Sequence, residues 1–305
     1  MNEALNIQAL NIQALNTELI RIGLDREFVM GQARAALVED LAGGVDATTV
    51  AIISENQSAK ADFTSRATGV LAGVAIAQAV LLVATDNQVD FEVFKKDGDF
   101  IYPGDVIFTV TGNARGILLG ERSALNFLGR LSGIATLTNE WVKALSGTSC
   151  KVRDTRKTTP GLRIFEKFAV RMGGGTNHRM SLSDVAMIKD NHIVAAGSID
   201  KAFRAVRSKY PNLPIEVEID SIDQIDAALS AGADLLLLDN MTPEQCKRAI
   251  SLIDGRARTE ASGGISLESV KAYAQSGVDY IAVGALTHSA KNIDIGVDFH
   301  EESRN

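Results

Sequence analysis

The feature that most constrains the fold is a regular alternation of short apolar runs and helix-type segments between residues 150 and 286. Six runs have strand-type sequence, namely KVRDT, VAMIK, IEVEI, LLLLD, RTEAS and YIAVG, and helical patterns separate them. Such alternation is typical of a parallel sheet with helical crossovers. A complete eight-unit barrel takes about 250 residues. The alternation therefore predicts an incomplete α/β barrel of six or seven strands.

The preceding half of the chain has a different pattern. Residues 48–110 contain the β-type runs TTVAII, GVLAG, DFEVF and VIFTV, broken by turn residues and by one helical insert at 74–84. This mixture predicts a small antiparallel sheet domain. A tandem LNIQA repeat within residues 4–16 is expected to form a helical or frayed extension, and a helix is predicted over 26–41.

Residues 115–145 carry leucines at near-helical spacing, which predicts one long helix or a broken pair. Gly129 and Gly133 within this stretch indicate close helix packing. We expect the domain bounds to be 1–133 for the sheet domain, 134–286 for the catalytic barrel, and 287–305 for a segment that returns to the first domain.

Residues 153–192 are basic within an acidic protein. They hold eight Lys or Arg against four Asp or Glu, whereas the whole chain has a net charge of -7. Arg156, Lys157 and Lys189 stand where predicted strands end, which is where parallel α/β folds bind ligands. The triplet Gly173 to Gly175 lets the backbone approach a ligand closely. These features favour an anion-binding site over a merely solvated basic face.

Composition excludes several classes of protein. An apolar content of 46% with 23% charged residues is typical of a globular domain, and a pI near 5.2 argues against a nucleic-acid partner. Cys150 and Cys246 have no metal-type spacing, which fits a reducing cytoplasm. The start of the chain lacks the pattern of a signal peptide, and the apolar stretch 70–84 is too short to span a membrane, so no membrane partner is expected.

Acidic and glycine residues at later strand ends add phosphate chemistry. Glu216 and Glu218 alternate onto one face of their strand, where a carboxylate needs a cation, metal or substrate. Asp239 ends a fully apolar strand and suits either a metal or a helix cap, and oxygen ligands without a Cys or His cluster favour Mg²⁺. The loops ASGGI and VGAL, at 261–265 and 283–286, predict a phosphate site. The residues thus indicate a Mg²⁺-assisted enzyme acting on a phosphorylated, multiply anionic substrate.

From about residue 24 to residue 299 the sequence resembles the quinolinate phosphoribosyltransferases. The resemblance rests on ERSALNFLGRLSGIAT, DTRKTTPGLR, GGGTNHRMSLSD, IKDNH, EVEID, LLLDN, ASGGI and VGALTHSA, in this order. It implies an N-terminal open β-sandwich-like domain before the incomplete α/β barrel. It also implies transfer of phosphoribose from 5-phosphoribosyl-1-pyrophosphate to quinolinate, with release of pyrophosphate and CO2 and formation of nicotinate mononucleotide.

The resemblance also implies roles for individual residues. The two carboxylates of quinolinate would be bound by Arg156, His178, Arg179 and Lys189, with Arg122 reaching in from the partner subunit of a homodimer. The catalytic residues would be Lys157 beside the pyrophosphate and the acidic pair Glu218 and Asp239 near the ribose and Mg²⁺. The 5-phosphate would lie on Ser262, Gly263, Gly264, Gly284 and Ala285. No organic cofactor is implied, and a hexamer remains an alternative to the dimer.

Two alternatives stay open at this point. One is a related phosphoribosyltransferase that acts on nicotinate or another aromatic acid without decarboxylation, and the number of cations near the acid site favours a dicarboxylate instead. The other is a non-catalytic anion-binding or regulatory protein, which the presence of Lys157, Glu218 and Asp239 disfavours.

Overall fold

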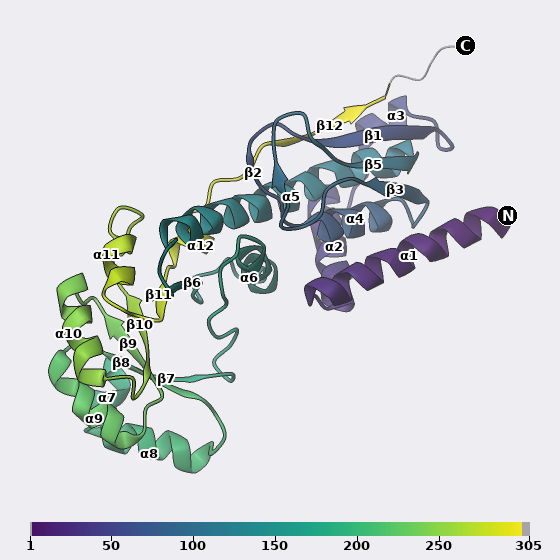
Figure 1. The fold of residues 1–305 in the computed structure, drawn as a ribbon. Helices are drawn as coiled ribbons and strands as arrows, with labels where there is room; N and C mark the ends of the chain where they lie inside the picture. The colour runs from purple at the N-terminus through teal and green to yellow at the C-terminus, as the bar shows by residue number, and fades with distance from the viewer. Residues whose placement is uncertain (1, 301–305) are drawn as a thin grey trace. The chain divides into compact units, whose positions relative to one another are not determined.

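The computed structural model describes residues 2–300, with side chains from residue 11 onward (Figure 1). The chain forms two compact units. Of the described residues, the first unit takes 2–136, 164–173 and 290–300, and the second takes 137–163 and 174–289. The division falls inside one long helix, α5 (Ala114–Ala144). The last five residues of the predicted segment 287–305 lie outside the described part.

The first unit is built on a four-stranded antiparallel sheet of order β12-β1-β5-β3, beside a two-stranded sheet of β2 and β4. Its strands are β1 (Ser58–Ser65), β2 (Gly69–Val70), β3 (Val89–Val93), β4 (Phe100–Ile101), β5 (Val106–Asn113) and β12 (Ile295–Phe299). Its helices, besides most of α5, are α1 (Asn2–Ile22), α2 (Arg26–Leu41), α3 (Ala47–Ile52), α4 (Val74–Ala84) and nearly all of α6 (Arg163–Met172). The small antiparallel sheet predicted for this region is therefore present.

Helix α4 forms the centre of the first unit's core. It is apolar around most of its circumference, as a helix enclosed by other elements must be, and eight of its residues are buried. Its first amide groups are capped from a distant loop, because Asp97 Oδ1 accepts hydrogen bonds from Gly73 N at 2.6 Å and Val74 N at 3.0 Å. In the sheet, the rings of Phe63 and Phe108 stack with centroids 4.3 Å apart.

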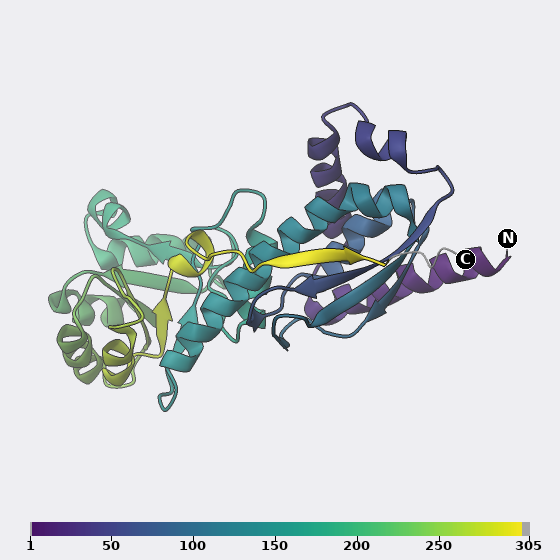
Figure 2. The same cartoon turned by 90° about the horizontal axis from the view of Figure 1, so that it is seen from above.

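The glycines of α5 are packed closely, as the sequence indicates, but the neighbour is an extended chain. A Cβ at Gly133 would lie 2.0 Å from Lys291 O, and one at Gly129 would lie 2.8 Å from Ile293 O. Ile293 N also donates to Gly129 O at 3.0 Å. The segment that leads into β12 therefore runs along α5 (Figure 2), and only glycine leaves room for it.

Gly133→Ala is expected to destabilise the protein by about 1–3 kcal/mol, the usual effect of overpacking, because its methyl group would meet a backbone carbonyl. Gly31→Ala is the matched control, since this exposed helical glycine has nothing within 4 Å and alanine favours helix by up to about 1 kcal/mol. Urea unfolding of both variants measures the difference. Equal stability of the two would contradict the close approach.

Local chemistry overturns one strand prediction. The run TTVAII has β-type residues, yet residues 47–52 form helix α3. Asp46 Oδ1 accepts a hydrogen bond from Thr49 N at 3.0 Å, so an N-cap outweighs the β-propensity of the residues that follow. The sequence interpretation also missed β1, whose burial alternates only in part.

The second unit contains the predicted parallel sheet, with six strands in the order β6-β11-β10-β9-β8-β7. They are β6 (Lys151–Arg153), β7 (Ala186–Ile188), β8 (Ile215–Ile219), β9 (Leu235–Asp239), β10 (Arg258–Ser262) and β11 (Tyr280–Ala282). The helical elements between and after them are α7 (Asp190–Ala196), α8 (Ile199–Lys209), η1 (Ile222–Gln224), α9 (Ile225–Ala231), α10 (Pro243–Ile253), α11 (Val270–Gln275) and α12 (Ala285–His288).

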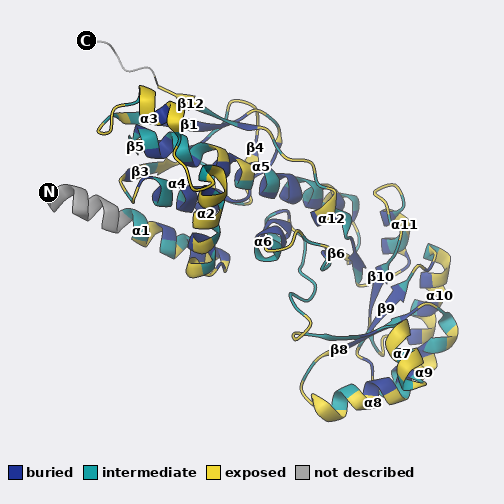
Figure 3. Ribbon diagram, turned by 180° about the vertical axis from the view of Figure 1, so that it is seen from behind, coloured by how far each residue is buried: buried dark blue, intermediate teal, exposed yellow. Residues whose placement is uncertain are grey.

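Helices α8 to α11 lie outside this sheet (Figure 1) and expose their polar faces, while the strands between them are largely buried (Figure 3). Two details differ from the expected array. The helix predicted after the first strand, α6, groups with the first unit, and the short helix α7 follows β7 without having been predicted. Within the described residues, no helix is long and apolar enough to cross a membrane.

Candidate active site

A cavity of about 760 Å³ lies in the second unit, at the edge where the parallel strands end. Because parallel strands share one direction, the residues that follow them in sequence gather at this edge. Residues from or just after all six strands line the cavity, namely Thr155, Arg156, Lys157, His178, Arg179, Met187, Lys189, Glu218, Leu237, Asp239, Asn240, Glu260, Ser262, Gly263, Gly264, Ile265, Ala282, Val283, Gly284, Ala285 and His288.

This lining contains every residue predicted for the site except Arg122. It brings together the four acid-binding candidates Arg156, His178, Arg179 and Lys189, the three catalytic candidates Lys157, Glu218 and Asp239, and the phosphate candidates Ser262, Gly263, Gly264, Gly284 and Ala285. Arg122 lies exposed on α5, in the part of that helix that belongs to the first unit.

Two arginines give the cavity an end suited to an acid. The Nε of Arg156 is buried and has no hydrogen-bond partner among the described residues. Arg179 is held in place by Nη1, which donates to Val185 O at 3.0 Å, and burial together with the charge of Arg156 lowers the pKa of Arg179. A buried guanidinium N–H without an acceptor is unfavourable, so a carboxylate would complete the contacts of Arg156.

Lys189 adds a third cation, placed by the first turn after β7. Its Nζ lies 2.6 Å from Glu218 Oε2, so the lysine is balanced by a carboxylate of the neighbouring strand. His192 Nδ1 accepts a hydrogen bond from Lys189 N at 3.0 Å. This contact gives His192 a structural role, because it caps α7 and fixes the backbone of the lysine.

Lys157 lies in the loop after β6, and hydrogen bonds hold both its backbone N–H and its backbone carbonyl. Lys157 N donates to Thr155 Oγ1 at 3.0 Å, and Thr287 Oγ1 donates to Lys157 O at 2.8 Å. The Lys157 ammonium has no ion-pair partner among the residues that the structure describes. A Cβ at Gly284 would lie 2.8 Å from Lys157 Cδ, so glycine at that position leaves the space through which the lysine extends.

The loop after β10 depends on glycine for both conformation and space. Gly263 has a φ of +96°, and a Cβ there would lie 2.1 Å from Asn240 Oδ1 and 2.9 Å from Asn240 N. Asn240 N also donates to Ser262 O at 2.8 Å, which ties the ends of β9 and β10 together. At Gly264, by contrast, the φ is +63° and nothing lies within 4 Å of a Cβ, so the backbone there is accessible, as a phosphate loop requires.

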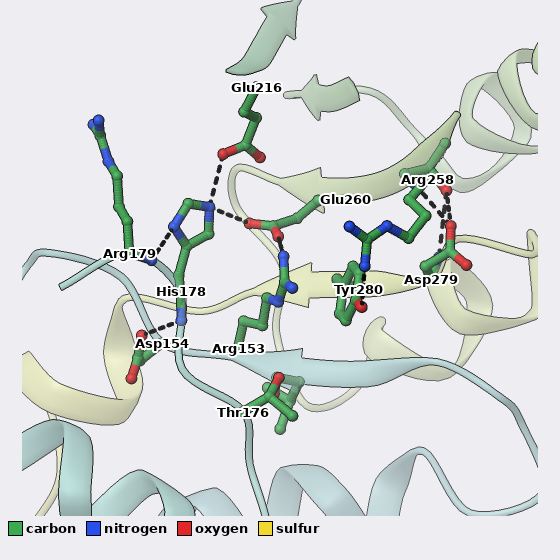
Figure 4. A network of polar contacts seen from close by, with 12 residues as sticks. Arg153, Asp154, Thr176, His178, Arg179, Glu216, Arg258, Glu260, Asp279 and Tyr280 are labelled. Carbon is green, nitrogen blue, oxygen red and sulfur yellow. Dashed lines mark hydrogen bonds and ion pairs between the residues drawn. The ribbon is translucent and has the colours of Figure 1, made fainter. Parts of the chain in front are cut away.

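Behind the cavity lies a buried polar cluster (Figure 4). His178 Nε2 is 2.9 Å from Glu216 Oε2 and 3.4 Å from Glu260 Oε1, and Arg153 Nη1 pairs with Glu260 Oε2 at 2.8 Å. Both glutamates are fully buried. Burial and the charge of Glu216 raise the pKa of Glu260 to about 7. Glu216 and Glu218, which alternate onto one face of β8, differ in environment, since Glu216 is buried and Glu218 lines the cavity.

Sequence reasoning missed two members of this site. Glu260 lies in the middle of a buried strand, and a charged residue at that position was the available signal. Asp154 is fully buried and organises the next loop, because its Oδ1 accepts from His178 N at 2.8 Å and its Oδ2 accepts from Asn177 Nδ2 at 2.6 Å. Its position directly after β6 did not distinguish it from a turn residue.

Comparison with known protein families gives matches over nearly the whole chain. Residues 46–132 match the model of the quinolinate phosphoribosyl transferase N-terminal domain, and residues 134–298 match that of the C-terminal domain. The chain belongs to the quinolinate phosphoribosyltransferase family. The family resemblance inferred from the motifs is thereby confirmed.

Individual members of the quinolinate phosphoribosyltransferase family are similar over most of their length. The carboxylating nicotinate-nucleotide pyrophosphorylase of Mycobacterium leprae is 49% identical over 271 residues, which cover 87% of this chain and 95% of that protein. The probable enzyme of the same name from Bacillus subtilis is 46% identical over 262 residues, covering 86% and 90%. The crystal structure of NadC from Streptococcus pyogenes is 43% identical and covers 91% and 99% of the chains, with a TM-score of 0.86.

Proposed function

We propose that this protein transfers phosphoribose from 5-phosphoribosyl-1-pyrophosphate to quinolinate with decarboxylation, giving nicotinate mononucleotide, pyrophosphate and CO2. Family membership supports this reaction. The observation that carries it is a single cavity in which an incompletely satisfied arginine, further cations, three carboxylates and two glycine-containing loops meet. This inventory matches a dicarboxylate and a phosphorylated sugar, and the reaction is one step toward NAD in the cytoplasm.

Quinolinate is proposed to bind at the arginine end of the cavity. Arg156 and Arg179 present guanidinium groups, which pair with carboxylates in a bidentate geometry and so supply orientation as well as charge. Lys189 lies near by, held against Glu218. A third cation favours a substrate with two carboxylates over nicotinate, which has one.

Phosphoribosyl pyrophosphate is proposed to bind in the same cavity, at the loops that follow β10 and β11. Its 5-phosphate would meet the backbone of the loops at 262–264 and 284–285, and its pyrophosphate would lie near Lys157. Glu218 and Asp239 would hold Mg²⁺, partly through water or substrate phosphates. Their donors fit such an ion, because each residue offers carboxylate oxygen and has only one oxygen engaged, with Lys189 and with Asn240 respectively.

The chemistry then follows from charge. The pyridine nitrogen of quinolinate attacks C1 of the ribose as the C1–O bond to pyrophosphate breaks, and Lys157 stabilises the charge that develops on the departing group. The ring nitrogen becomes positive and accepts the electron pair that remains when the adjacent carboxylate leaves as CO2, after which a proton replaces it. The Mg²⁺ would neutralise phosphate charge. The protein contributes positioning and electrostatic stabilisation.

The same proposal includes the finer architecture. We infer that the six-stranded parallel sheet is an incomplete α/β barrel and that the antiparallel unit is an open β-sandwich-like domain. The order of the parallel sheet supports this. Strands β6 and β7 are consecutive in this sheet along the chain but form its two edges, with four strands between them, which is the order of a barrel left open between its first two strands. Side chains from non-adjacent strands also meet on one face, as the contacts of Glu216 and Glu260 with His178 require.

The test is incubation of the purified protein with quinolinate, 5-phosphoribosyl-1-pyrophosphate and Mg²⁺, with nicotinate mononucleotide followed by mass and CO2 by release of label from the 2-carboxylate. Nicotinate replaces quinolinate in a parallel reaction. Product from nicotinate alone would support the non-decarboxylating alternative, and no turnover of either acid would support an anion-binding protein without catalysis.

We propose further that Arg122 serves the acid site of a partner subunit in a homodimer. A mixture of Arg122→Ala and Lys189→Ala subunits, each nearly inactive alone, is then expected to recover up to about a quarter of the wild-type activity, since random exchange restores one intact site in half of the dimers. Activity is measured after subunit exchange is confirmed by mass. Absence of recovery despite exchange would contradict a shared site.

A further inference from the structure

The buried cluster behind the cavity occupies a position that barrels usually fill with apolar side chains. Arg153, Glu260 and Glu216 come from β6, β10 and β8, which are alternate strands in the sheet order. Alternate strands contribute to one interior layer of an α/β barrel, and that layer is normally made of branched apolar residues. Here the layer carries charges, and His178 contacts two of them (Figure 4); His178 and Glu260 also line the cavity.

Stability does not account for this layer. Replacing a buried ion pair by well-packed apolar residues is often neutral or stabilising, because desolvation offsets the attraction between the charges. Glu216 is the least compensated member, since His178 Nε2 at 2.9 Å is its one ion-pair contact among the described residues and neither of its carboxylate oxygens makes a well-aligned hydrogen bond. Burying a carboxylate with so few partners is unfavourable, which indicates a functional role for Glu216 in the site.

The hydrogen bonds around His178 identify that task. Its Nδ1 accepts a hydrogen bond from Arg179 N at 2.6 Å, so Nδ1 carries a lone pair and the ring proton belongs on Nε2. Nε2 lies 2.9 Å from Glu216 Oε2 and 3.4 Å from Glu260 Oε1, and although neither contact is a well-aligned hydrogen bond, two carboxylates this close favour a proton on that nitrogen. The neighbouring carboxylates raise the pKa of His178 against the opposing effect of burial. Protonating Nδ1, however, would set its hydrogen against the Arg179 N–H, so the local geometry favours the neutral ring.

The same geometry disfavours a metal ion. The ligand atoms of His178, Glu216 and Glu260 lie within 4.8 Å of one another, which is close enough to surround a cation. A metal at this place would need the lone pair of Nε2, yet that nitrogen carries the proton when Nδ1 is the acceptor. Metal-binding histidines instead donate their second ring N–H to an oxygen, the reverse of what Arg179 N imposes here.

We propose that Glu216 and Glu260, with Arg153 behind them, are positioning residues that hold His178 as its Nε2–H tautomer and so fix the backbone of Arg179 at the acid-binding end of the cavity. The inference rests on the proposed function only for the identity of that acid. His178 is then anchored at three points: its ring nitrogens on the glutamates and on Arg179 N, and its backbone N–H on Asp154 Oδ1. Arg179 N engages Nδ1, and the two carboxylates lie beside Nε2, so the ring meets the substrate through its carbon edge and the adjacent Arg179 supplies the charge. This differs from the direct carboxylate contact that the family resemblance implies for His178.

The tautomer is measured without any substrate. Protein labelled with ¹⁵N-histidine has four rings to observe, and the signals of His178 are those lost in His178→Gln. The expected result at neutral pH is an unprotonated Nδ1 and a protonated Nε2. A proton on Nδ1, in either the other tautomer or the imidazolium, would overturn the proposal. A Zn²⁺ titration in which Nε2 loses its proton to the metal would overturn it as well. Neither outcome depends on whether quinolinate is the substrate.

Two substitutions of Glu216 test whether an oxygen at this position keeps the proton on His178 Nε2. Glu216→Gln keeps an oxygen that accepts from Nε2–H and is expected to keep the tautomer and most of the affinity for the acid. Glu216→Leu removes the nearer acceptor and is expected to raise the KM for quinolinate about five- to tenfold, the size of one net hydrogen bond, with little change in the KM for phosphoribosyl pyrophosphate.

Thermal unfolding of both variants checks that they fold. Equal KM values in the Leu variant and the wild type would overturn the positioning role, and so would a Gln variant as impaired as the Leu variant, because charge rather than an acceptor would then be required. If the Leu variant does not fold, the wild-type spectrum and the Gln variant still decide the question.

Discussion

Lys157→Ala is expected to lower kcat by about 100- to 1000-fold, the usual effect of removing one group that stabilises charge developing in a transition state. The structure gives the reason in two hydrogen bonds and one unpaired charge among the described residues. The loop holding Lys157 is anchored by Thr155 and Thr287, and its ammonium has no ion-pair partner among the described residues. The cation is therefore available for a departing pyrophosphate. Single-turnover kinetics at saturating substrates measure the chemical step.

Lys151→Ala is the matched control for that experiment. Lys151 is an exposed lysine at the first residue of the same strand, β6, and so lies at the end of the sheet opposite to the cavity. It is expected to retain wild-type kcat. A Lys157→Ala variant within about threefold of wild type would remove Lys157 from the leaving-group role and leave it as one of several surface cations near the cavity.

Arg156→Ala is expected to lower kcat/KM for quinolinate by about 10- to 150-fold for each charged hydrogen bond lost, or about 1.5–3 kcal/mol. The free protein buries the Nε of Arg156 without an acceptor, so the carboxylate satisfies a donor that is otherwise unpaired. The KM for quinolinate should rise far more than that for phosphoribosyl pyrophosphate. Steady-state kinetics with each substrate varied in turn measure the two effects.

Arg156→Lys sharpens this second experiment, because lysine keeps the charge but loses the planar pair of donors. It should recover only part of the affinity if the contact is bidentate. Arg204→Ala serves as the control, since Arg204 lies exposed on α8 and pairs with Asp200 at 2.8 Å, a contact of a kind worth about 0.3–0.5 kcal/mol. Full activity of Arg156→Ala would place the acid elsewhere in the cavity.

Local patterns determined most of the elements correctly for identifiable reasons. Helix α2 matched its predicted bounds because Asp25 caps its start and the chain turns left-handed at Ala42. Helix α4 matched because its apolar run is bounded by Gly73 and by polar residues. The pattern failed at α3, where a capping aspartate acts against β-type residues, and at β12, which is defined only by its pairing with β1. Pairing across more than two hundred residues leaves no local signal.

For the site, the strand pattern predicted most of the residues that gather in the cavity, because parallel strands bring their carboxyl ends to one edge whatever their order in the sheet. That rule placed Arg156, Lys189 and Asp239 together without coordinates. The residues that lie behind them depend on the three-dimensional fold. Glu260 and Glu216 meet His178 because the sheet brings side chains from alternate strands onto one inner face. The tautomer of the histidine depends on hydrogen bonds to groups that are distant in sequence, and a one-dimensional pattern does not record those distances.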